Sequence, residues 1–152
     1  MIEPYGTIVN SFLGGFAKIG FSKLQESDYS VTLSRSKSCV EISTEKYYHP
    51  TLTTRFLDEN GKKFSMRIIR EVLAPGQLDK DSIELKAIRK GFHLDDAGID
   101  EALRNQGVAA YVTLAIEQLL HFLTSYEKDL VSGSFKSEYV TREKAALKKI
   151  GL

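Results

Sequence analysis

Four consecutive segments in the first half of the chain alternate apolar and polar residues, and this pattern constrains the fold more than any other feature. The segments are residues 29–33, 40–42, 52–56 and 64–68. Successive side chains of a β-strand point to opposite faces, so the alternation predicts four strands that are each buried on one side. Turn signals stand at Ser36-Lys37 and Asn60-Gly61. The pattern therefore predicts a four-stranded antiparallel meander with one apolar face and one face rich in serine, threonine and arginine.

A helical pattern precedes the predicted sheet. Between Tyr5 and Phe21 apolar residues recur every three or four positions, which is typical of one face of a helix. Gly20 stands where such a helix would end. Gly14 and Gly15 fall inside it, in a pattern that fits neither a dinucleotide fingerprint nor a phosphate loop. We interpret them as small residues that let this helix approach the sheet closely.

Further helices are expected after the sheet, which residues 74–76 (Ala-Pro-Gly) should end. A short helix is expected over residues 81–89, and a long one from Asp96 to residues 132–134 that Gly107 could interrupt. A last amphipathic helix is expected to start near Thr141. Its apolar side would consist of Leu147 and Ile150. Together these patterns predict an α+β fold whose C-terminal helices pack on one face of the sheet.

Length and composition bound the architecture and the class of partner. A chain of 152 residues with 42% hydrophobic residues suits a single domain, residues 1–152, that needs no disulfide or metal to fold. Lysine and arginine number 21 against 20 aspartates and glutamates, a net charge of +1. Nucleic-acid binders usually carry a clear basic excess, so nucleic acid is not the expected partner.

Cysteine content and hydropathy predict the compartment. Cys39 is the single cysteine, so no intramolecular disulfide can form, and no secretory signal is visible at the N-terminus. The most apolar stretch, residues 108–123, is interrupted by Glu117, Gln118 and His121, and falls short of the roughly 20 apolar residues of a membrane span. We therefore expect a cytoplasmic protein with no membrane segment.

Candidate catalytic groups are sparse. His121 is expected on the outer side of the long helix, and His93, followed by two aspartates, matches no established zinc spacing. Cys39 is expected to be a partly exposed thiol, with no base nearby to activate it. No carboxylate pair, no Ser-His-Asp arrangement and no glycine-rich cradle is recognisable. The chain is therefore expected to be neither an enzyme nor a protein with a metal or cofactor.

The loop between the second and third predicted strands carries the residues that favour a contact surface. It reads Tyr47-Tyr48-His49-Pro50, and tyrosine is enriched where proteins bind one another. The alternative is a packed loop whose tyrosines cover the sheet edge. With two arginines of the polar sheet face, the predicted partner-binding residues are Tyr47, Tyr48, His49, Arg55 and Arg67, all expected to be exposed.

The first helix contains Phe16-x-x-x-Gly20-Phe21 and is followed by the alternating runs 29–33 and 39–43. This layout, over about the first half of the chain, resembles small bacterial α+β proteins of the immunity type, which neutralise a cognate toxin by direct binding. Such families share no residue signature, so the resemblance implies no site residues. Inhibitors of nuclease toxins are often acidic, and the nearly neutral charge of this chain argues against a nuclease as the partner.

The patterns therefore predict a protein-binding module, and the resemblance implies that it is an immunity protein that binds and neutralises a bacterial toxin. One alternative is a small-ligand-binding protein or enzyme with a site between the sheet and the helices, in which His93 or His49 lies beside a carboxylate. Another is a structural role as a homo-oligomer that associates through the long helix or an open sheet edge.

Overall fold

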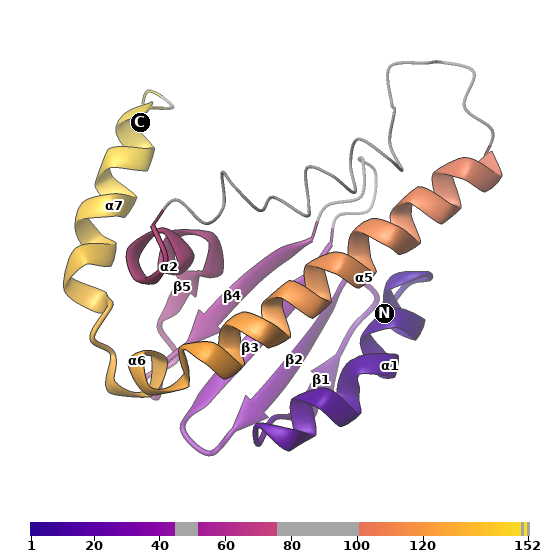
Figure 1. Ribbon diagram of the computed structural model, residues 1–152, viewed down its shortest axis with the longest axis horizontal. Helices are drawn as coiled ribbons and strands as arrows, with labels where there is room; N and C mark the ends of the chain where they lie inside the picture. The colour runs from indigo at the N-terminus through magenta and orange to yellow at the C-terminus, as the bar shows by residue number, and fades with distance from the viewer. Residues whose placement is uncertain (45–51, 76–100, 150, 152) are drawn as a thin grey trace.

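The structure is a computed structural model that describes residues 1–44, 52–75, 101–149 and 151, with backbone alone for residues 101–107 and 111. It confirms a mixed α+β fold with an N-terminal helix, an antiparallel sheet and C-terminal helices (Figure 1). The described elements are α1 (Tyr5–Lys18), β1 (Ser22–Glu26), β2 (Ser30–Arg35), β3 (Ser38–Ser43), β4 (Thr53–Leu57), β5 (Lys63–Ser65), α2 (Met66–Leu73), α5 (Glu101–Ser125), α6 (Glu127–Ser132) and α7 (Lys136–Lys149).

The sheet is an antiparallel meander in the order β1-β2-β3-β4-β5, so every strand pairs with its neighbour in sequence. The meander confirms the predicted topology, but it contains a strand that the prediction missed, β1. The last predicted strand, residues 64–68, is also wrong in part. It ends at Ser65, where α2 begins, because Met66, Ile69 and Arg70 are spaced to bury one side of a helix.

Helices cover one face of this sheet. In Figure 1, α5 runs diagonally across the face, and α1 lies beside it near β1. The side chains on this face are the apolar set that alternation predicted, and they form one buried cluster with the inner sides of the helices. The sheet contributes Val31, Leu33, Val40, Ile42, Phe56 and Phe64, and the helices contribute residues such as Val9, Phe16, Ile116, Leu119 and Leu123.

Gly15 marks the closest approach of α1 to α5. A Cβ atom built on Gly15 would lie 2.7 Å from Cδ2 of Leu120, whereas one on Gly14 would meet nothing within 4 Å. The prediction that small residues allow a close approach therefore holds for Gly15, but the neighbour is a helix and not the sheet. Gly20, just after α1, has a φ of +89°, the left-handed conformation expected of a glycine that ends a helix.

The long helix is continuous through Gly107 and ends earlier than predicted. α5 stops at Ser125, and Tyr126 leaves the helical conformation with φ −115° and ψ 25°. α6 follows and ends at Gly133, whose φ is 72°. The expected single helix to residues 132–134 is therefore two helices. The predicted short helix over residues 81–89 and the predicted helix start at Asp96 lie outside the described residues, as does the last residue of the predicted break at 74–76. The element that ends just before this break, at Leu73, is α2 and not a strand of the sheet.

Within α5, the window Val108–Ser125 has a mean hydropathy of 1.3 and is long enough to cross a membrane by length and composition alone. A core helix of a soluble protein passes the same test. Val112, Ile116 and Leu119 of this window are buried in the cluster shared with the sheet. This packing favours a core helix, and exposed His121 lies on the outer side as predicted.

The last helix begins earlier than predicted and buries a different side. α7 starts at Lys136, not near Thr141, because Phe135 and Tyr139 anchor it against the ring of Phe64 at 5.2 and 5.0 Å in edge-to-face contacts. Leu147, expected on the inner side, is 41% exposed, and Ile150 lies outside the described residues. The aromatic contacts that hold α7 therefore come from Tyr139 in its first turns and from Phe135 just before it.

Arg35 at the end of β2 joins three elements. Its guanidinium carbon lies 4.4 Å from the ring centre of Phe21, which precedes β1. Nη1 donates to the backbone oxygen of Ile19 at 3.3 Å and to the Glu127 carboxylate at 3.2 Å. With 12% of its side chain exposed, this arginine is mostly buried. It therefore connects the end of α1, the sheet and the start of α6.

Candidate interaction surface

The face of the sheet opposite the helices is uncovered in the described part of the chain. Residues directly opposite one another in an antiparallel ladder point to the same side, and the register pairs Thr32 with Glu41, Glu41 with Arg55, and Arg55 with Ser65. None of the side chains on this side is buried. We call this surface the open face; it consists of Ser22, Gln25, Ser30, Thr32, Ser34, Cys39, Glu41, Ser43, Thr53, Arg55, Leu57, Lys63 and Ser65.

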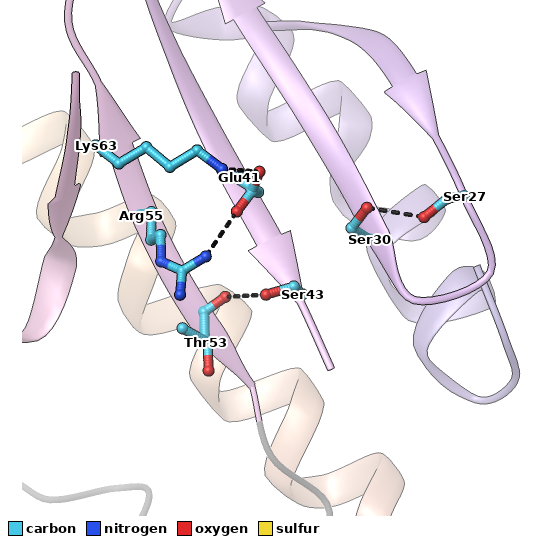
Figure 2. A network of polar contacts seen from close by, with 7 residues as sticks. All are labelled: Ser27, Ser30, Glu41, Ser43, Thr53, Arg55 and Lys63. Atoms are coloured by element: carbon cyan, nitrogen blue, oxygen red, sulfur yellow. Dashed lines mark hydrogen bonds and ion pairs between the residues drawn. The ribbon is translucent and has the colours of Figure 1, made fainter. Parts of the chain in front are cut away.

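A three-residue charge cluster lies on the open face across β3, β4 and β5. One carboxylate oxygen of Glu41 contacts Nη1 of Arg55 at 3.2 Å, and the other contacts Nζ of Lys63 at 3.4 Å (Figure 2). The Glu41 side chain is 19% exposed, whereas those of Arg55 and Lys63 are 44% and 53% exposed. The anion is therefore recessed between two cations that project into solvent.

The rest of the open face is small and hydroxyl-rich. The Ser43 hydroxyl donates to the backbone oxygen of Thr53 at 3.4 Å, and Ser30 shares a 2.8 Å hydrogen bond with Ser27 beyond the end of β1 (Figure 2). Half-buried Leu57 is its one large apolar side chain within the described strands. The face is polar and low in relief, so contacts on it depend on hydrogen bonds and charge more than on apolar burial.

The structure places two of the five predicted contact residues. Arg55 is exposed on the open face, and Arg67 is exposed on α2 and not on a strand. Their expected exposure is confirmed. Tyr47, Tyr48 and His49 lie outside the described residues, as does His93. Cys39 is partly exposed, as expected, and lies on the open face.

Glu41 and Lys63 are the charged members of the open face that the sequence interpretation missed. Glu41 stands at a polar position of an alternating segment and has the parity that would place it beside Arg55, whereas Lys63 lies just before the predicted segment 64–68. The signal for Glu41 was therefore present in the strand parity. It becomes visible only once the register of neighbouring strands is known, because a shift of one residue moves every side chain to the other face.

Each edge of the sheet carries a feature that discourages the addition of a further strand. At β5, the amide of Ser65 donates to the phenol oxygen of Tyr139 at 2.7 Å. The pKa of Tyr139 lies above its ordinary value, because burial and the Glu143 carboxylate raise it more than the hydrogen bond from the Ser65 amide lowers it. The Tyr139 phenol, and not a further strand, therefore accepts the hydrogen bond of this edge amide.

At the other edge, β1 contains a β-bulge. The register slips between Lys23 and Gln25, and the residue between them, Leu24, is 64% exposed. Charges flank the bulge, since Glu26 contacts Lys23 at 3.6 Å and the N-terminal ammonium of Met1 at 3.3 Å. The ammonium holds the pKa of Glu26 below its ordinary value. Bulges and edge charges are devices that discourage strand addition, so the open face is the more accessible surface.

A shallow cavity of about 140 Å³ lies where the β2–β3 turn, the β4–β5 turn and α6 meet. Its lining includes Lys37, Asp58, Val131 and Lys136. The Asp58 carboxylate already has partners, because it accepts hydrogen bonds from the backbone amides of Asn60 and Lys62 and from the ammonium of Lys136, each at 2.9 Å. The ammonium lowers the pKa of Asp58. Typical small-molecule sites have ~300 Å³ or more, so this cavity does not favour the ligand-binding alternative.

The described residues include no group of three His, Cys, Asp or Glu side chains that could hold a metal ion. Comparison with known proteins finds no family model, no curated protein and no solved structure that matches this chain. What the fold and the surface define is an α+β domain with one covered and one open sheet face. Functional inference therefore starts from this surface.

Proposed function

We propose that this chain is a protein-binding module that contacts its partner through the open face. The observation that carries the proposal is an exposed polar sheet face with a projecting charge cluster, on a sheet whose two edges each carry a feature that discourages strand addition. A partner would approach the face and not extend the sheet. The role is that of a binder and not of an enzyme.

The size of the open face is consistent with part of an interface. Five strands of three to six residues, about 10–20 Å long and about 4.8 Å apart, give a flat area on the order of 400 Å². Each partner in a standard protein complex contributes roughly 800 Å². The proposal assigns the remaining contacts to Arg67 and to Tyr47, Tyr48 and His49, which belong to the segment that joins β3 to β4 in sequence.

The class of partner in this proposal is a bacterial toxin that the chain neutralises in the cytoplasm. This choice is supported by the resemblance of the first half of the chain to immunity-type proteins. It predicts that the partner, expressed alone in a bacterial host, arrests growth, and that co-expression of this chain restores growth. A partner without toxic activity would leave the binding role and overturn the toxin assignment.

The contact surface is tested by a matched pair of substitutions. Thr32→Trp places a bulky neutral side chain on the open face, and Thr124→Trp places the same side chain on the exposed side of α5. Tagged wild type and both variants are used to capture partners from lysate of the source cells, with mass spectrometry as the readout. We expect the Thr32 variant to lose the stoichiometric partner and the Thr124 variant to keep it.

Two outcomes contradict the proposal: equal capture by both variants, or loss of the partner with the Thr124 variant alone. Circular dichroism of each variant checks that the fold is retained. A second test replaces Tyr47 and Tyr48 with alanine, which should weaken binding without lowering the melting temperature.

A further inference from the structure

The open face carries unbalanced charge. Its charged residues are Glu41, Arg55 and Lys63, so two cations stand against one anion. A single carboxylate cannot neutralise both. The cluster therefore keeps a net charge of one positive unit, on a protein whose charges are otherwise almost balanced.

The geometry makes these cations available to a partner. Their contacts with Glu41, at 3.2 and 3.4 Å, are longer than the roughly 2.7–2.9 Å of a tight charge-assisted hydrogen bond. Ion pairs with this much solvent exposure contribute little to folding. Arg55 and Lys63 are also longer than the neighbouring Ser43, Thr53 and Ser65 side chains, so an approaching surface meets them first.

Resting on the proposed function, we infer that the open face binds an acidic segment of a protein partner, whose carboxylates dock on the solvent-exposed sides of Arg55 and Lys63, above the recessed Glu41. The planar guanidinium of Arg55 suits a carboxylate in bidentate geometry, and Lys63 adds a second charge within reach. The hydroxyls of Thr32, Ser43 and Thr53 line the path on which an extended acidic segment would lie across the strands.

An acidic protein is favoured over a nucleic acid as the occupant. Duplex binders neutralise several phosphates with several cations, and single-strand binders stack bases on aromatic rings. The described open face offers two projecting cations and no aromatic side chain. One partner carboxylate neutralises the net charge of this cluster, whereas a phosphate backbone would leave most of its charge unpaired.

The test uses a random-peptide phage display library as the probe. Peptides are selected on wild-type protein and measured against three double variants by biolayer interferometry. Arg55→Glu with Lys63→Glu reverses the cluster, and Lys18→Glu with Lys128→Glu makes the same change in net charge at exposed positions on the helices. Arg55→Gln with Lys63→Gln is the milder change, used if three acidic side chains together destabilise the sheet.

We expect the selected peptides to be enriched in aspartate and glutamate. Their affinity should fall at least about tenfold on the cluster variants and stay within about twofold on the helix variant. Peptides with lysine in place of the acidic residues should bind the charge-reversed protein and so restore the pairing. Selected peptides without acidic enrichment, undiminished binding to the cluster variants, or no selectable peptide would overturn the inference.

The same experiment separates this inference from the proposed function. Peptides whose binding Thr32→Trp abolishes but that carry no acidic enrichment would overturn the acidic partner and leave the open face as a contact surface. Selected peptides that bind the Thr32 variant as tightly as wild type would count against both. A DNA duplex that competes with the peptides and depends equally on Arg55 and Lys63 would overturn the preference for a protein.

Discussion

Alanine substitutions at two adjacent glycines of α1 test the close packing of α1 on α5. Gly14 is exposed, and a Cβ atom there would meet nothing within 4 Å. Gly15 is half-buried, and a Cβ atom there would lie 2.7 Å from Cδ2 of Leu120. The two positions share a helix and a backbone conformation, so they differ mainly in this contact.

The expected magnitudes follow from two opposing effects. Replacing glycine with alanine inside a helix stabilises it by about 1 kcal/mol, and Gly14→Ala should gain all of it. At Gly15 the leucine methyl must move by about 1 Å to reach ordinary contact, and overpacking of this kind costs about 1–3 kcal/mol. Leu120 is half-exposed and can adjust, so the lower end applies. Gly15→Ala should therefore be neutral to about 1 kcal/mol destabilising.

Urea unfolding followed by circular dichroism measures both variants. The difference between them should be about 1–2 kcal/mol, or about 2–8 °C in melting temperature for a domain of this size. Removing the leucine side chain should cancel the penalty, so Gly15→Ala in a Leu120→Ala background should stabilise like Gly14→Ala. If Gly15→Ala stabilises wild type as much as Gly14→Ala does, the close approach of the two helices is refuted.

Further predictions concern the contacts that tie β2, β4 and β5 to the C-terminal helices. Tyr139→Phe keeps the ring but removes the acceptor for the Ser65 amide, which should cost about 1–3 kcal/mol in urea unfolding and speed hydrogen exchange of that amide. Lys136 lowers the folded-state pKa of Asp58. The contribution of this ion pair to folding stability is therefore complete above the ordinary aspartate pKa of about 3.9, and it is lost as the pH falls through the pKa of Asp58 in the folded protein. Below about pH 4, Asp58→Asn should therefore show a shallower loss of stability than wild type, and parallel pH curves would contradict this. Arg35→Met keeps the aliphatic stem but removes the cation over the Phe21 ring and both hydrogen bonds, which should lower stability by about 1–2 kcal/mol; an unchanged midpoint would refute the role of the guanidinium.

Alternation predicted the central strands because burial there is one-sided. Val31, Leu33, Val40 and Ile42 are fully buried and the residues between them are not, so the physical cause of the pattern is present. β1 has no such one-sided burial. All five of its residues are exposed, and the bulge at Leu24 disrupts the alternation, so no periodicity of burial exists for a sequence pattern to reflect.

The junction of β5 and α2 was ambiguous for a different reason. Phe64, Met66 and Ile68 fit period two, while Met66, Ile69 and Leu73 fit the spacing of a helix. Strand pairing with β4 decides in favour of a strand only as far as Ser65. Local periodicity does not contain that information, because the pairing depends on residues earlier in the chain.

The open face was predictable in character and not in detail. Ser30, Thr32, Thr53, Arg55 and Ser65 occupy polar positions of the alternating segments, so a polar exposed face followed from the pattern. The Glu41 cluster depends on the register of three strands. The position of Arg67 depends on where β5 gives way to a helix, which explains why it was expected on the sheet.

The order of the strands has a consequence for the synthesis of the protein. The five strands can assemble as successive hairpins once Ser65 has left the ribosome, because each pairs with its neighbour in sequence. α5, which crosses their apolar face, ends at Ser125, about 60 residues later, or about 3–12 s at ~5–20 residues per second. During those seconds α1 and α2 are the described helices already made, and part of the apolar face has no cover. Nascent chains that stall in this interval should therefore bind chaperones that full-length chains do not.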